Sequence, residues 1–404
     1  MERYSEYKDS GVEWLGEIPR HWELRKMKFS FEERSQKGFP TLPLLAATQN
    51  HGVIRKSDYE NRTVEATKSL DTLKLVEVGD FVISLRSFQG GIELCHDRGI
   101  ISPAYTILKP THIKSCYFKY LGKSPIYLQL LKSMVTGIRE GQNIDYGKLR
   151  ENLIPIPTEA EQVAIANYLD KVTSKIDAAI AQQQKMIELL NERKQIIINN
   201  AVTKGLDPTA KMKPSSIPWL GNIPVHWEVI RMRYLCRITT GNKDTINRVD
   251  DGIYPFYVRS PKVERINTYS YEGEAVLMAG DGVGAGKVFH YATGKFDFHQ
   301  RVYLFYDTRK IKARLLYYYL QSNFKYVIEQ LSAKSTVDSV RLNMIQDFPV
   351  LIPSEAEQNQ IIASLDSHLS TINALIAFIE KKISFLQERK HIIINDLVTG
   401  KVKL

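Results

Sequence analysis

Glycine-rich loops after predicted buried strands carry the side chains of this sequence that are best suited to contact a ligand. These loops are RSFQGG at 86–91 and GDGVGAG at 280–286; glycine lets the backbone approach a ligand closely, and loops commonly carry binding residues. In the major groove of DNA, arginine contacts guanine, and glutamine or asparagine contacts adenine. The candidate base contacts are therefore Gln49, Asn50, Arg55, Arg86 and Gln89 in the first half of the chain, and Asn242, Lys243, Arg259, His299, Gln300 and Arg301 in the second. For any one of them, a solvated surface position is the competing interpretation.

The second loop does not match a phosphate-binding motif. A P-loop would require glycine where Asp281 stands and serine or threonine where Val288 stands, and a GxGxxA match beginning at Gly280 lacks a strand–helix–strand setting. The amino-methyltransferase motif, with two prolines before an aromatic residue, does not occur, and His21 and His226 have no metal ligands at suitable spacing. Together these observations favour a binding protein without catalytic residues or a metal site, in which both histidines have core or capping roles.

The composition is typical of a soluble globular chain with an excess of basic residues. The 404 residues are 43% hydrophobic and 25% charged, and the net charge of +10 favours a polyanionic partner because each neutralised phosphate releases counterions. Three scattered cysteines argue against a disulfide framework and a CxxC metal site. No stretch approaches the roughly 18 consecutive apolar residues of a membrane span, and the first residues do not resemble a secretion signal. We expect a cytoplasmic protein with no membrane partner.

The chain is a tandem duplication whose ends repeat and whose middles diverge. WLGEIPRHWE (14–23) returns as WLGNIPVHWE (219–228), and these two segments contain all four tryptophans. IPTEAEQ (156–162) returns as IPSEAEQ (352–358), and LNERKQIIINNAVT (190–203) returns as LQERKHIIINDLVT (386–399). A common frame that carries two different readers would show this pattern. We interpret the tryptophans as core residues that fix each reader to the frame, with base stacking as the alternative.

A long helix is predicted to begin at each EAEQ segment. Thr158 precedes Glu161 by three residues, and Ser354 precedes Glu357 by three, which is the spacing of a capping box. Gly205 and Gly400 suit the C-terminal ends, so each helix covers about 45 residues, or about 65 Å. An apolar 4-3 spacing predicts an antiparallel coiled-coil seam, formed by Ile165, Leu169, Val172, Ile176 and Leu190 with Ile361, Leu365, Ile372, Leu375, Ile379 and Leu386. Packing of each helix on its own domain is the alternative.

The isoleucine runs near the helix ends exceed what one seam needs. Residues 196–198 and 392–394 therefore predict a second apolar face, covered either by a partner protein or by the neighbouring domain.

The middles have the same predicted order of elements in both halves. A buried strand within 75–85 or 271–280 is followed by a second strand within 101–110 or 299–307, and then by an amphipathic helix at 127–135 or 315–324. We predict a mixed α+β fold with two α/β domains joined by two long antiparallel helices in a pseudo-twofold arrangement. The predicted segments are an N-terminal repeated segment (1–23), the first middle domain (24–157), the first long helix (158–205), a linker with the repeated decapeptide (206–228), the second middle domain (229–353) and the second long helix (354–404).

The order of these motifs resembles the specificity subunit of a type I restriction-modification system. The resemblance covers essentially the whole chain and rests on DSGVEWLGEIPRHWEL before a variable domain, IPIPTEAEQ after it and LLNERKQIIINNAVTKGL at the end of a helix, with the whole order repeated. It implies two target recognition domains that each read half of a bipartite, asymmetric DNA site, while the helices set the spacer. It also implies docking of two modification subunits and of restriction subunits. The chain itself would be non-catalytic and without a cofactor; S-adenosylmethionine, ATP and Mg would belong to the complex.

Two other classes of protein remain as alternatives. One is a coiled-coil scaffold that joins proteins without reading DNA, and the other is a stand-alone nuclease with unrecognised motifs. Sequence-selective, salt-dependent binding to duplex DNA separates the main interpretation from the scaffold. DNA cleavage or methylation by the chain alone would favour a catalytic protein.

Overall fold

The chain forms two compact units, each built from one middle domain and parts of both long helices. The structure, a computed structural model, describes all residues except 1, 60–69, 86, 137–142 and 333–338. Unit 1 comprises Met1–Gln183 and Lys381–Leu404, and unit 2 comprises Gln184–Glu380. The unit boundaries therefore cut through α5 (Glu159–Lys204) and α9 (Glu355–Val398), whereas the predicted segments treat each helix as a separate region. The physical reason is that each half of a helix packs into the core of its own unit.

Unit 1 is built around a four-stranded antiparallel sheet with the order β4-β11-β8-β9. Two pairs, β5-β6 and β7-β10, lie beside it, and β1-β2 and β12-β13 form hairpins. The strands are β1 (Tyr7–Asp9), β2 (Glu17–Pro19), β3 (Glu23–Lys26), β4 (Phe31–Arg34), β5 (Leu45–Thr48), β6 (Gly52–Arg55), β7 (Lys74–Val76), β8 (Phe81–Ile83), β9 (Glu93–Leu94), β10 (Gly99–Ile101), β11 (Thr106–Pro110), β12 (Val135–Thr136), β13 (Asn143–Ile144) and β14 (Leu153–Ile156). The short helices are α1 (Ser87–Gly90), α2 (Ser115–Leu121), α3 (Pro125–Ser133) and α4 (Tyr146–Leu149).

Unit 2 repeats this plan and adds a second four-stranded sheet. The sheet β18-β25-β22-β23 has the same connectivity as the main sheet of unit 1, and the added sheet has the order β20-β19-β24-β21. The strands are β15 (Met212–Pro214), β16 (Asn222–Pro224), β17 (Glu228–Arg231), β18 (Arg237–Thr240), β19 (Tyr254–Tyr257), β20 (Glu264–Ile266), β21 (Tyr271–Glu272), β22 (Ala275–Ala279), β23 (Phe289–Ala292), β24 (Lys295–Phe298), β25 (Val302–Tyr306) and β26 (Pro349–Ile352). The short helices are α6 (Ala313–Asn323), α7 (Lys325–Ser332) and α8 (Leu342–Gln346).

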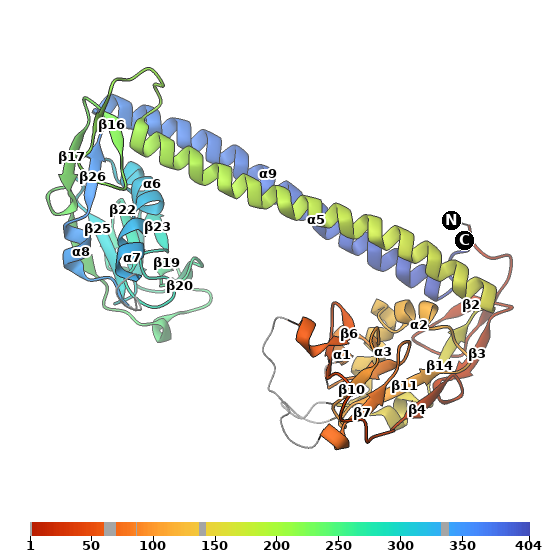
Figure 1. The fold of residues 1–404 in the computed structure, drawn as a ribbon. Coiled ribbons are helices and arrows are strands. Elements are labelled where there is room, and N and C mark those ends of the chain that lie inside the picture. Colours follow the sequence, from red (N-terminus) through yellow and green to blue (C-terminus); the bar gives the residue numbers. More distant parts are fainter. Residues whose placement is uncertain (1, 60–69, 86, 137–142, 333–338) are drawn as a thin grey trace. The chain divides into compact units, whose positions relative to one another are not determined.

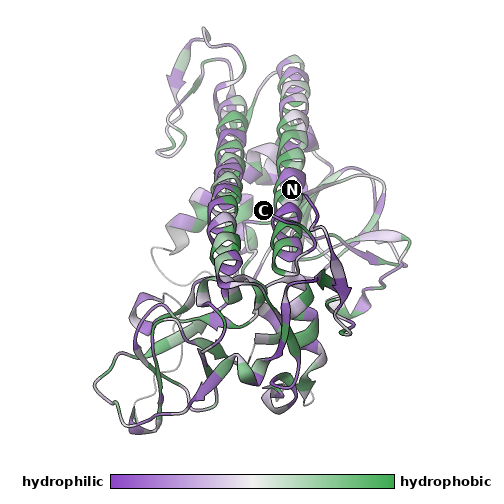
Figure 2. Ribbon diagram, turned by 90° about the vertical axis from the view of Figure 1, so that its right-hand side faces the viewer, coloured by the Kyte–Doolittle hydropathy of each residue, from purple (hydrophilic) through white to green (hydrophobic). Residues whose placement is uncertain are grey.

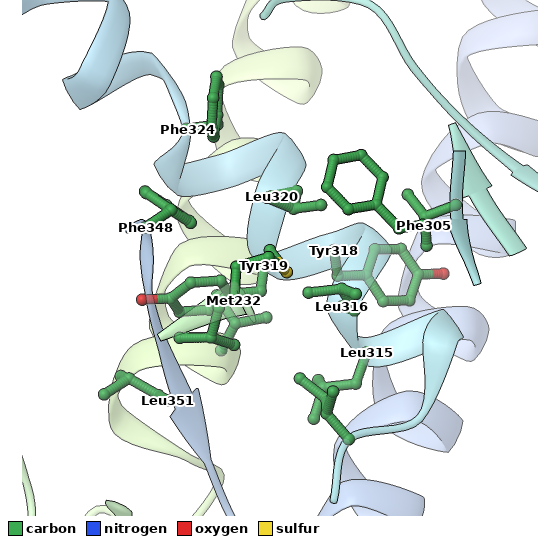
Figure 3. Packing of buried hydrophobic residues seen from close by; sticks show 14 of the residues in the cluster. Met232, Phe305, Leu315, Leu316, Tyr318, Tyr319, Leu320, Phe324, Phe348 and Leu351 are labelled. Carbon is green, nitrogen blue, oxygen red and sulfur yellow. The ribbon is translucent and has the colours of Figure 1, made fainter. Parts of the chain in front are cut away.

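The core of unit 2 shows why the predicted strands and helices assemble as they do. All five residues of β22 are buried, as its uninterrupted apolar sequence requires for a central strand. Phe305 of β25 and Tyr319 of α6 belong to one cluster with Phe324 and Phe348. Figure 3 shows Tyr319 and Phe348 on one side of α6 and Phe305 on the other. The cluster also includes Ile198 of α5 and Ile361 of α9, so both long helices share the core of this unit.

Each middle domain begins and ends on one strand pair. In unit 1, β3 pairs antiparallel with β14, so that Glu23 faces Ile156. In unit 2, β17 pairs antiparallel with β26, so that Glu228 faces Ile352. The chain therefore enters and leaves each domain at adjacent positions, directly before the long helix begins.

The glutamine after each capping glutamate binds the backbone at the start of a helix in the middle domain. Oε1 of Gln162 accepts from the backbone N–H of Lys114 at 2.8 Å, and Oε1 of Gln358 accepts from that of Lys312 at 2.9 Å. These two lysines directly precede α2 and α6. The counterpart of α6 is therefore α2, and the predicted match of the helix at 127–135 with that at 315–324 is wrong.

The two long helices are antiparallel. In unit 1, Nζ of Lys390 donates to Oδ1 of Asp177 at 2.6 Å, and in unit 2, Nζ of Lys194 donates to Oδ1 of Asn373 at 2.9 Å. Moving toward the end of α5 thus means moving toward the start of α9, and the helices lie side by side within each unit (Figure 1). Hydrophobic and hydrophilic residues alternate along both helices (Figure 2), as a packed seam requires.

The buried stripe of each helix departs from the predicted seam at one of the predicted positions. Val172 is half-buried while Thr173 is buried, and Leu375 is 44% exposed while Ile376 is half-buried. Near its start, α5 buries residues at a 4-4-3 spacing, which corresponds to about 3.67 residues per turn and suits a straight helix; a 4-3 spacing requires about 3.5. This extra four-residue step shifts the stripe by one position. Of the other predicted seam residues, Leu386 is half-buried, and the buried ones are Ile165, Leu169, Ile176, Leu190, Ile361, Leu365, Ile372 and Ile379.

The isoleucine runs face two environments. Ile198 and Ile394 are buried in the cores of their units, whereas Ile196 is 54% exposed and Ile392 is 52% exposed. The neighbouring domain therefore covers only part of each run.

Helix α9 contains one window of 18 residues that is long and apolar enough to cross a membrane by length and composition alone. Ile361 and Leu365 of this helix lie in the core of unit 2, and a helix that contributes to a core passes the same test.

Candidate nucleic-acid interface

The repeated decapeptide packs a tryptophan against the ends of both long helices in each unit. Trp22 is fully buried, and its Nε1 donates to Oε1 of Glu161 at 3.4 Å. A Cβ at Gly400, whose φ is +75°, would lie 3.0 Å from the Trp22 ring. Trp227 is likewise fully buried and donates to Oε1 of Glu357 at 3.3 Å. These two tryptophans are therefore core residues of the frame, and they present no surface on which a base could stack.

The glutamates that receive these bonds also start the long helices. In unit 2, the backbone N–H of Ser354 donates to Oε2 of Glu357 at 3.1 Å, and the backbone N–H of Glu357 donates to Oγ of Ser354 at 3.4 Å. Nε2 of His226 lies 2.8 Å from Oε1 of the same carboxylate. The capping box is therefore confirmed, and the histidine completes it. Unit 1 has the same contacts among Thr158, Glu161 and His21.

The carboxylate at the start of α9 is held in its ionised form. Burial raises the pKa of Glu357, but hydrogen bonds from His226, Ser354 and Trp227 outweigh burial and lower the pKa to about 2. In unit 1, burial raises the pKa of Glu161 and hydrogen bonds from His21, Thr158 and Trp22 lower it, with a net lowering. A depressed carboxyl pKa adds stability above the unfolded-state value and loses that stability as the pH falls toward the folded-state value.

We expect acid to weaken unit 2 through Glu357 between about pH 4.5 and pH 2. Glu357→Gln should lower the free energy of unfolding at pH 7 by about 1–3 kcal/mol, because charge-assisted hydrogen bonds are lost. It should also flatten the decline in stability over that acid range, as measured by thermal unfolding at a series of pH values. Glu355→Gln is the matched control, since Glu355 lies two residues before Glu357 in the same first turn and is exposed. An unchanged acid profile in Glu357→Gln would contradict the assignment.

The candidate base contacts of unit 1 gather around one polar depression. Gln49 and Asn50 in the β5-β6 turn and Gln89 in α1 are exposed and line a hollow of about 1030 Å³, together with Thr48, His51, Ser84 and Ser87. Arg55 is exposed at the end of β6 and forms an ion pair with Asp97 at 3.2 Å; it does not line this hollow. Arg86 lies outside the described residues.

A buried carboxylate at the floor of this depression holds its loops together. Glu93 is 2% exposed, and Nζ of Lys123 lies 2.6 Å from its Oε2. Nζ of Lys123 also donates to the backbone oxygen of Gln49 at 2.9 Å. Burial raises the pKa of Glu93 to about 7, although Lys123 acts in the opposite direction. The pair therefore links the β5-β6 turn to the segment after α1.

Sheet topology gathers the candidate residues of unit 2 at one edge. Strands β19 and β24 are parallel, so Arg259 and His299 leave the sheet on the same side. Strands β18 and β25 are antiparallel, with Thr240 opposite Tyr303, so the segment with Asn242 and Lys243 lies beside residues 299–301. The loop 280–286 begins at the same edge, because Ala279 of β22 is opposite Val302 of β25.

One aspartate binds two of the candidate arginines. Nη1 of Arg259 lies 3.1 Å from Oδ1 of Asp281, and Nη1 of Arg301 lies 2.9 Å from Oδ2. The Asp281 side chain is only 15% exposed, whereas those of Arg259 and Arg301 are 43% and 61% exposed. A depression of about 430 Å³ lies beside this group and is lined by Arg259, Asp281 and the glycine-rich loop.

A second aspartate, Asp244, binds the neighbouring loop. The same loop shows that the prediction for His299 is wrong. Nε2 of Gln300 donates to Oδ2 of Asp244 at 2.7 Å. His299 is 2% exposed, and its Nδ1 accepts from the backbone N–H of Arg301 at 2.9 Å. Burial lowers the pKa of His299, against the effect of Asp244. His299 is thus a buried support for the loop and not an exposed base contact, because it follows β24 directly into the core. Asn242 and Gln300 are exposed, and Lys243 is half-buried.

Sequence reasoning missed Asp281 and Glu93. In the sequence, Asp281 stands out only as a mismatch to a P-loop. The pairing of β22 with β25 brings Arg301 beside it, and the pairing of β19 with β24 brings Arg259 to the same edge. The available signal was an acidic residue between two glycines at the end of a fully buried strand. Glu93 gave no signal, because an isolated glutamate is most often solvated.

Comparison with known protein families gives a match that covers most of unit 2. A family model described as "Type I restriction modification DNA specificity domain" matches residues 224–384. The chain carries a type I DNA specificity domain. The matched range contains Asp281 and both of its arginines, together with the start of α9.

Relatives of the specificity domain are named as subunits of type I restriction enzymes. The chain is 31% identical over 182 residues to the EcoDI specificity subunit of Escherichia coli, covering 45% of this chain and 40% of that protein. It is 26% identical over 304 residues to the MjaVIII specificity subunit of Methanocaldococcus jannaschii, covering 69% of each. The resemblance to type I specificity subunits, and with it the expectation of a non-catalytic subunit, is confirmed by these names and by the family description.

A solved structure shows that the likeness extends over the whole fold. A chain from a study of complex assembly and conformational transition of the type I R-M system superposes with a TM-score of 0.72 at 15% identity, covering 95% of this chain and 99% of that one. The predicted fold class, two α/β domains with two long antiparallel helices, is confirmed.

Proposed function

We propose that this chain is the DNA-reading subunit of a type I restriction-modification complex, in which each unit reads one half of a bipartite, asymmetric site. The observation that carries the proposal is that the two units have the same contacts at the starts of the long helices but different polar surfaces on their middle domains. Contacts among the tryptophan, histidine and capping glutamate are the same in both units. The polar edges differ: amides and hydroxyls line the hollow in unit 1, and arginines bound to an aspartate occupy the edge in unit 2.

The helices and the composition support the remaining parts of the proposal. Two antiparallel helices shared by both units are suited to set the spacer between half-sites. The net charge of +10 favours a polyanionic ligand. The chain brings no cofactor; S-adenosylmethionine, ATP and Mg act in the modification and restriction subunits of the complex, which operates in the cytoplasm.

Methylation-site sequencing of a host that expresses this chain with its modification subunit tests the proposal directly. The expected result is one asymmetric motif with two specified parts and an unspecified spacer of constant length. A continuous motif would contradict the proposal. Methylation of the motif that persists without this chain would contradict it as well. DNA cleavage by the chain alone would instead favour a nuclease.

Exposed apolar residues on α9 are the proposed docking surface for a modification subunit. Phe378, Phe385 and Ile392 follow each other at seven-residue intervals and are 67%, 57% and 52% exposed. Residues at this spacing share one face of a helix. Large exposed apolar side chains in a row are typical of a protein interface.

We expect Phe385→Ser to weaken association with the modification subunit by about tenfold or more, because truncation of a buried aromatic anchor costs about 2 kcal/mol. The measurement is the dissociation constant of the purified complex. Gln387→Ser, which shortens an exposed side chain on the opposite side of the same helix, is the control and should bind normally. Equal loss in both variants, or no loss in Phe385→Ser, would remove this face as the docking surface.

A further inference from the structure

The glycine-rich loop of unit 2 is built tightly against the two arginines that Asp281 binds. A Cβ at Gly284 would lie 2.4 Å from the backbone oxygen of Arg259, and a Cβ at Gly280 would lie 3.1 Å from that of Arg301. The backbone N–H of Gly280 also donates to the oxygen of Arg301 at 2.9 Å. The loop needs glycine at these positions for close packing on the arginine backbones, and not for cradling a phosphate.

The carboxylate of Asp281 restricts both guanidiniums without using all their donors. Each carboxylate oxygen accepts from one arginine, so the two side chains are held on either side of a group that is itself largely buried. An arginine carries several further N–H donors in a planar fork, and both guanidiniums reach the surface. Holding side chains in place before binding reduces the entropy that binding must otherwise cost.

A restrained guanidinium with free donors is suited to reading a base. The fork binds O6 and N7 of guanine with two parallel hydrogen bonds, and this geometry is demanding. Phosphate contacts tolerate more freedom, since they position a protein without reading sequence. At the tip of the same loop, Val283 is 96% exposed, so the loop projects beyond the sheet edge.

An acidic residue beyond the far end of β25 provides an internal comparison. Asp307, at the other end of β25, also pairs with two arginines, Arg237 and Arg309, at 3.3 Å each. Its side chain is 47% exposed, and those arginines are 66% and 68% exposed. This is an ordinary surface network of the kind that contributes little. Partial burial, a neighbouring depression and glycine packing distinguish the Asp281 group from it.

We propose that Asp281 positions Arg259 and Arg301 as a pair of guanine-reading side chains, and that these three residues determine the specificity of unit 2. The inference rests on the proposed function and makes it more specific. The DNA half-site read by unit 2 contains guanine at two base pairs, one recognised by each arginine. Arg259 and Arg301 contact the bases, and Asp281 is a positioning residue that acts through both.

The test is selection of bound duplexes from a randomised pool by the full chain assembled with its modification subunit, followed by sequencing. Arg259→Gln and Arg301→Gln should each reduce the preference for guanine at one base pair by about tenfold or more and leave the other positions unchanged. Asp281→Asn should reduce both guanine preferences together. Asp307→Asn is the matched control, because it breaks the two ion pairs at the opposite end of β25 and should leave every preference intact.

Three results would overturn the inference. These are a unit 2 half-site without guanine, arginine variants that lower affinity equally for all sequences, and an Asp281→Asn variant with unchanged preferences. Thermal unfolding of each variant shows whether the unit is folded, and Arg259→Lys and Arg301→Lys keep the charge while removing the fork, so they test the same point with less risk to folding. If the wild-type complex selects no sequence at all, the proposed function itself fails, which is a different outcome.

Discussion

Replacement of residues 24–157 by the corresponding middle of another type I specificity subunit is expected to change one half of the recognised DNA site and leave the other unchanged. The physical basis is the strand pair that closes the domain. Glu23 faces Ile156 across β3 and β14, so both junctions lie at adjacent positions, and the domain can be exchanged without opening the frame. Each base pair that no longer matches should cost about 1–3 kcal/mol of discrimination, so the original half-site should be lost completely.

The donor segment must preserve the contacts that the domain makes with the helices of unit 1. Oη of Tyr117 donates to the backbone oxygen of Val398 at 2.8 Å, and Oη of Tyr120 lies 2.5 Å from Oδ1 of Asp170. A donor with tyrosine at both positions is therefore preferred. The measurement is methylation-site sequencing, and exchange of residues 229–353 is the reciprocal experiment, which should change only the other half. A change in both halves after either exchange would contradict independent readers.

Trp22→Ala should lower the stability of unit 1 by about 3–5 kcal/mol, the usual cost of removing a fully buried tryptophan side chain. Trp22 is fully buried, lies against Gly400 and donates to Glu161, so its loss leaves a cavity where both long helices meet the middle domain. For a unit of this size, the Tm of the corresponding transition should fall on the order of 10 °C. Calorimetry measures this transition, and amide hydrogen exchange assigns it to a unit.

The duplication supplies matched controls for this experiment. Trp227→Ala should have an effect of the same size on unit 2, since Trp227 is equally buried and Gly205 packs on its ring. Trp14→Ala should cost less, because Trp14 is only half-buried. Equal loss of amide protection in both units after Trp22→Ala would show that the tryptophan does not serve its own unit alone. If Trp22→Ala lowers the stability of unit 1 no more than Trp14→Ala does, Trp22 does not hold the long helices to the middle domain.

Local patterns in the sequence were sufficient to predict the frame. The spacing of Thr158 with Glu161 and of Ser354 with Glu357 depends only on hydrogen bonds within one helical turn, and the structure has both capping boxes. Gly205 and Gly400, with φ of +78° and +75°, end the helices as expected. The repeats predicted two domains of matching topology, because like sequences at both ends require like surroundings.

Tertiary structure decided the details that depend on contacts between distant segments. The buried stripe of the helices shifted by one position, since packing on a globular core favours a straight helix near its start. His299 lies on a polar-looking stretch but is buried, because β24 runs into the core up to that residue. The counterpart of α6 proved to be α2, because a glutamine contact identifies it and apolar periodicity alone does not.

The candidate site, too, was predicted in part from the sequence and in part only from the tertiary structure. Residue type and loop position alone indicated Gln49, Asn50 and Gln89 in unit 1 and Arg259 and Arg301 in unit 2, and the structure places each group at one edge of its domain. The sequence by itself thus determined that a repeated frame carries two different polar surfaces, since helix caps, strand patterns and loop composition are local properties. Only the tertiary structure decided that Asp281 joins two of those arginines. Their side chains come from strands that are distant in the chain, and sheet pairing is the interaction that brings them together.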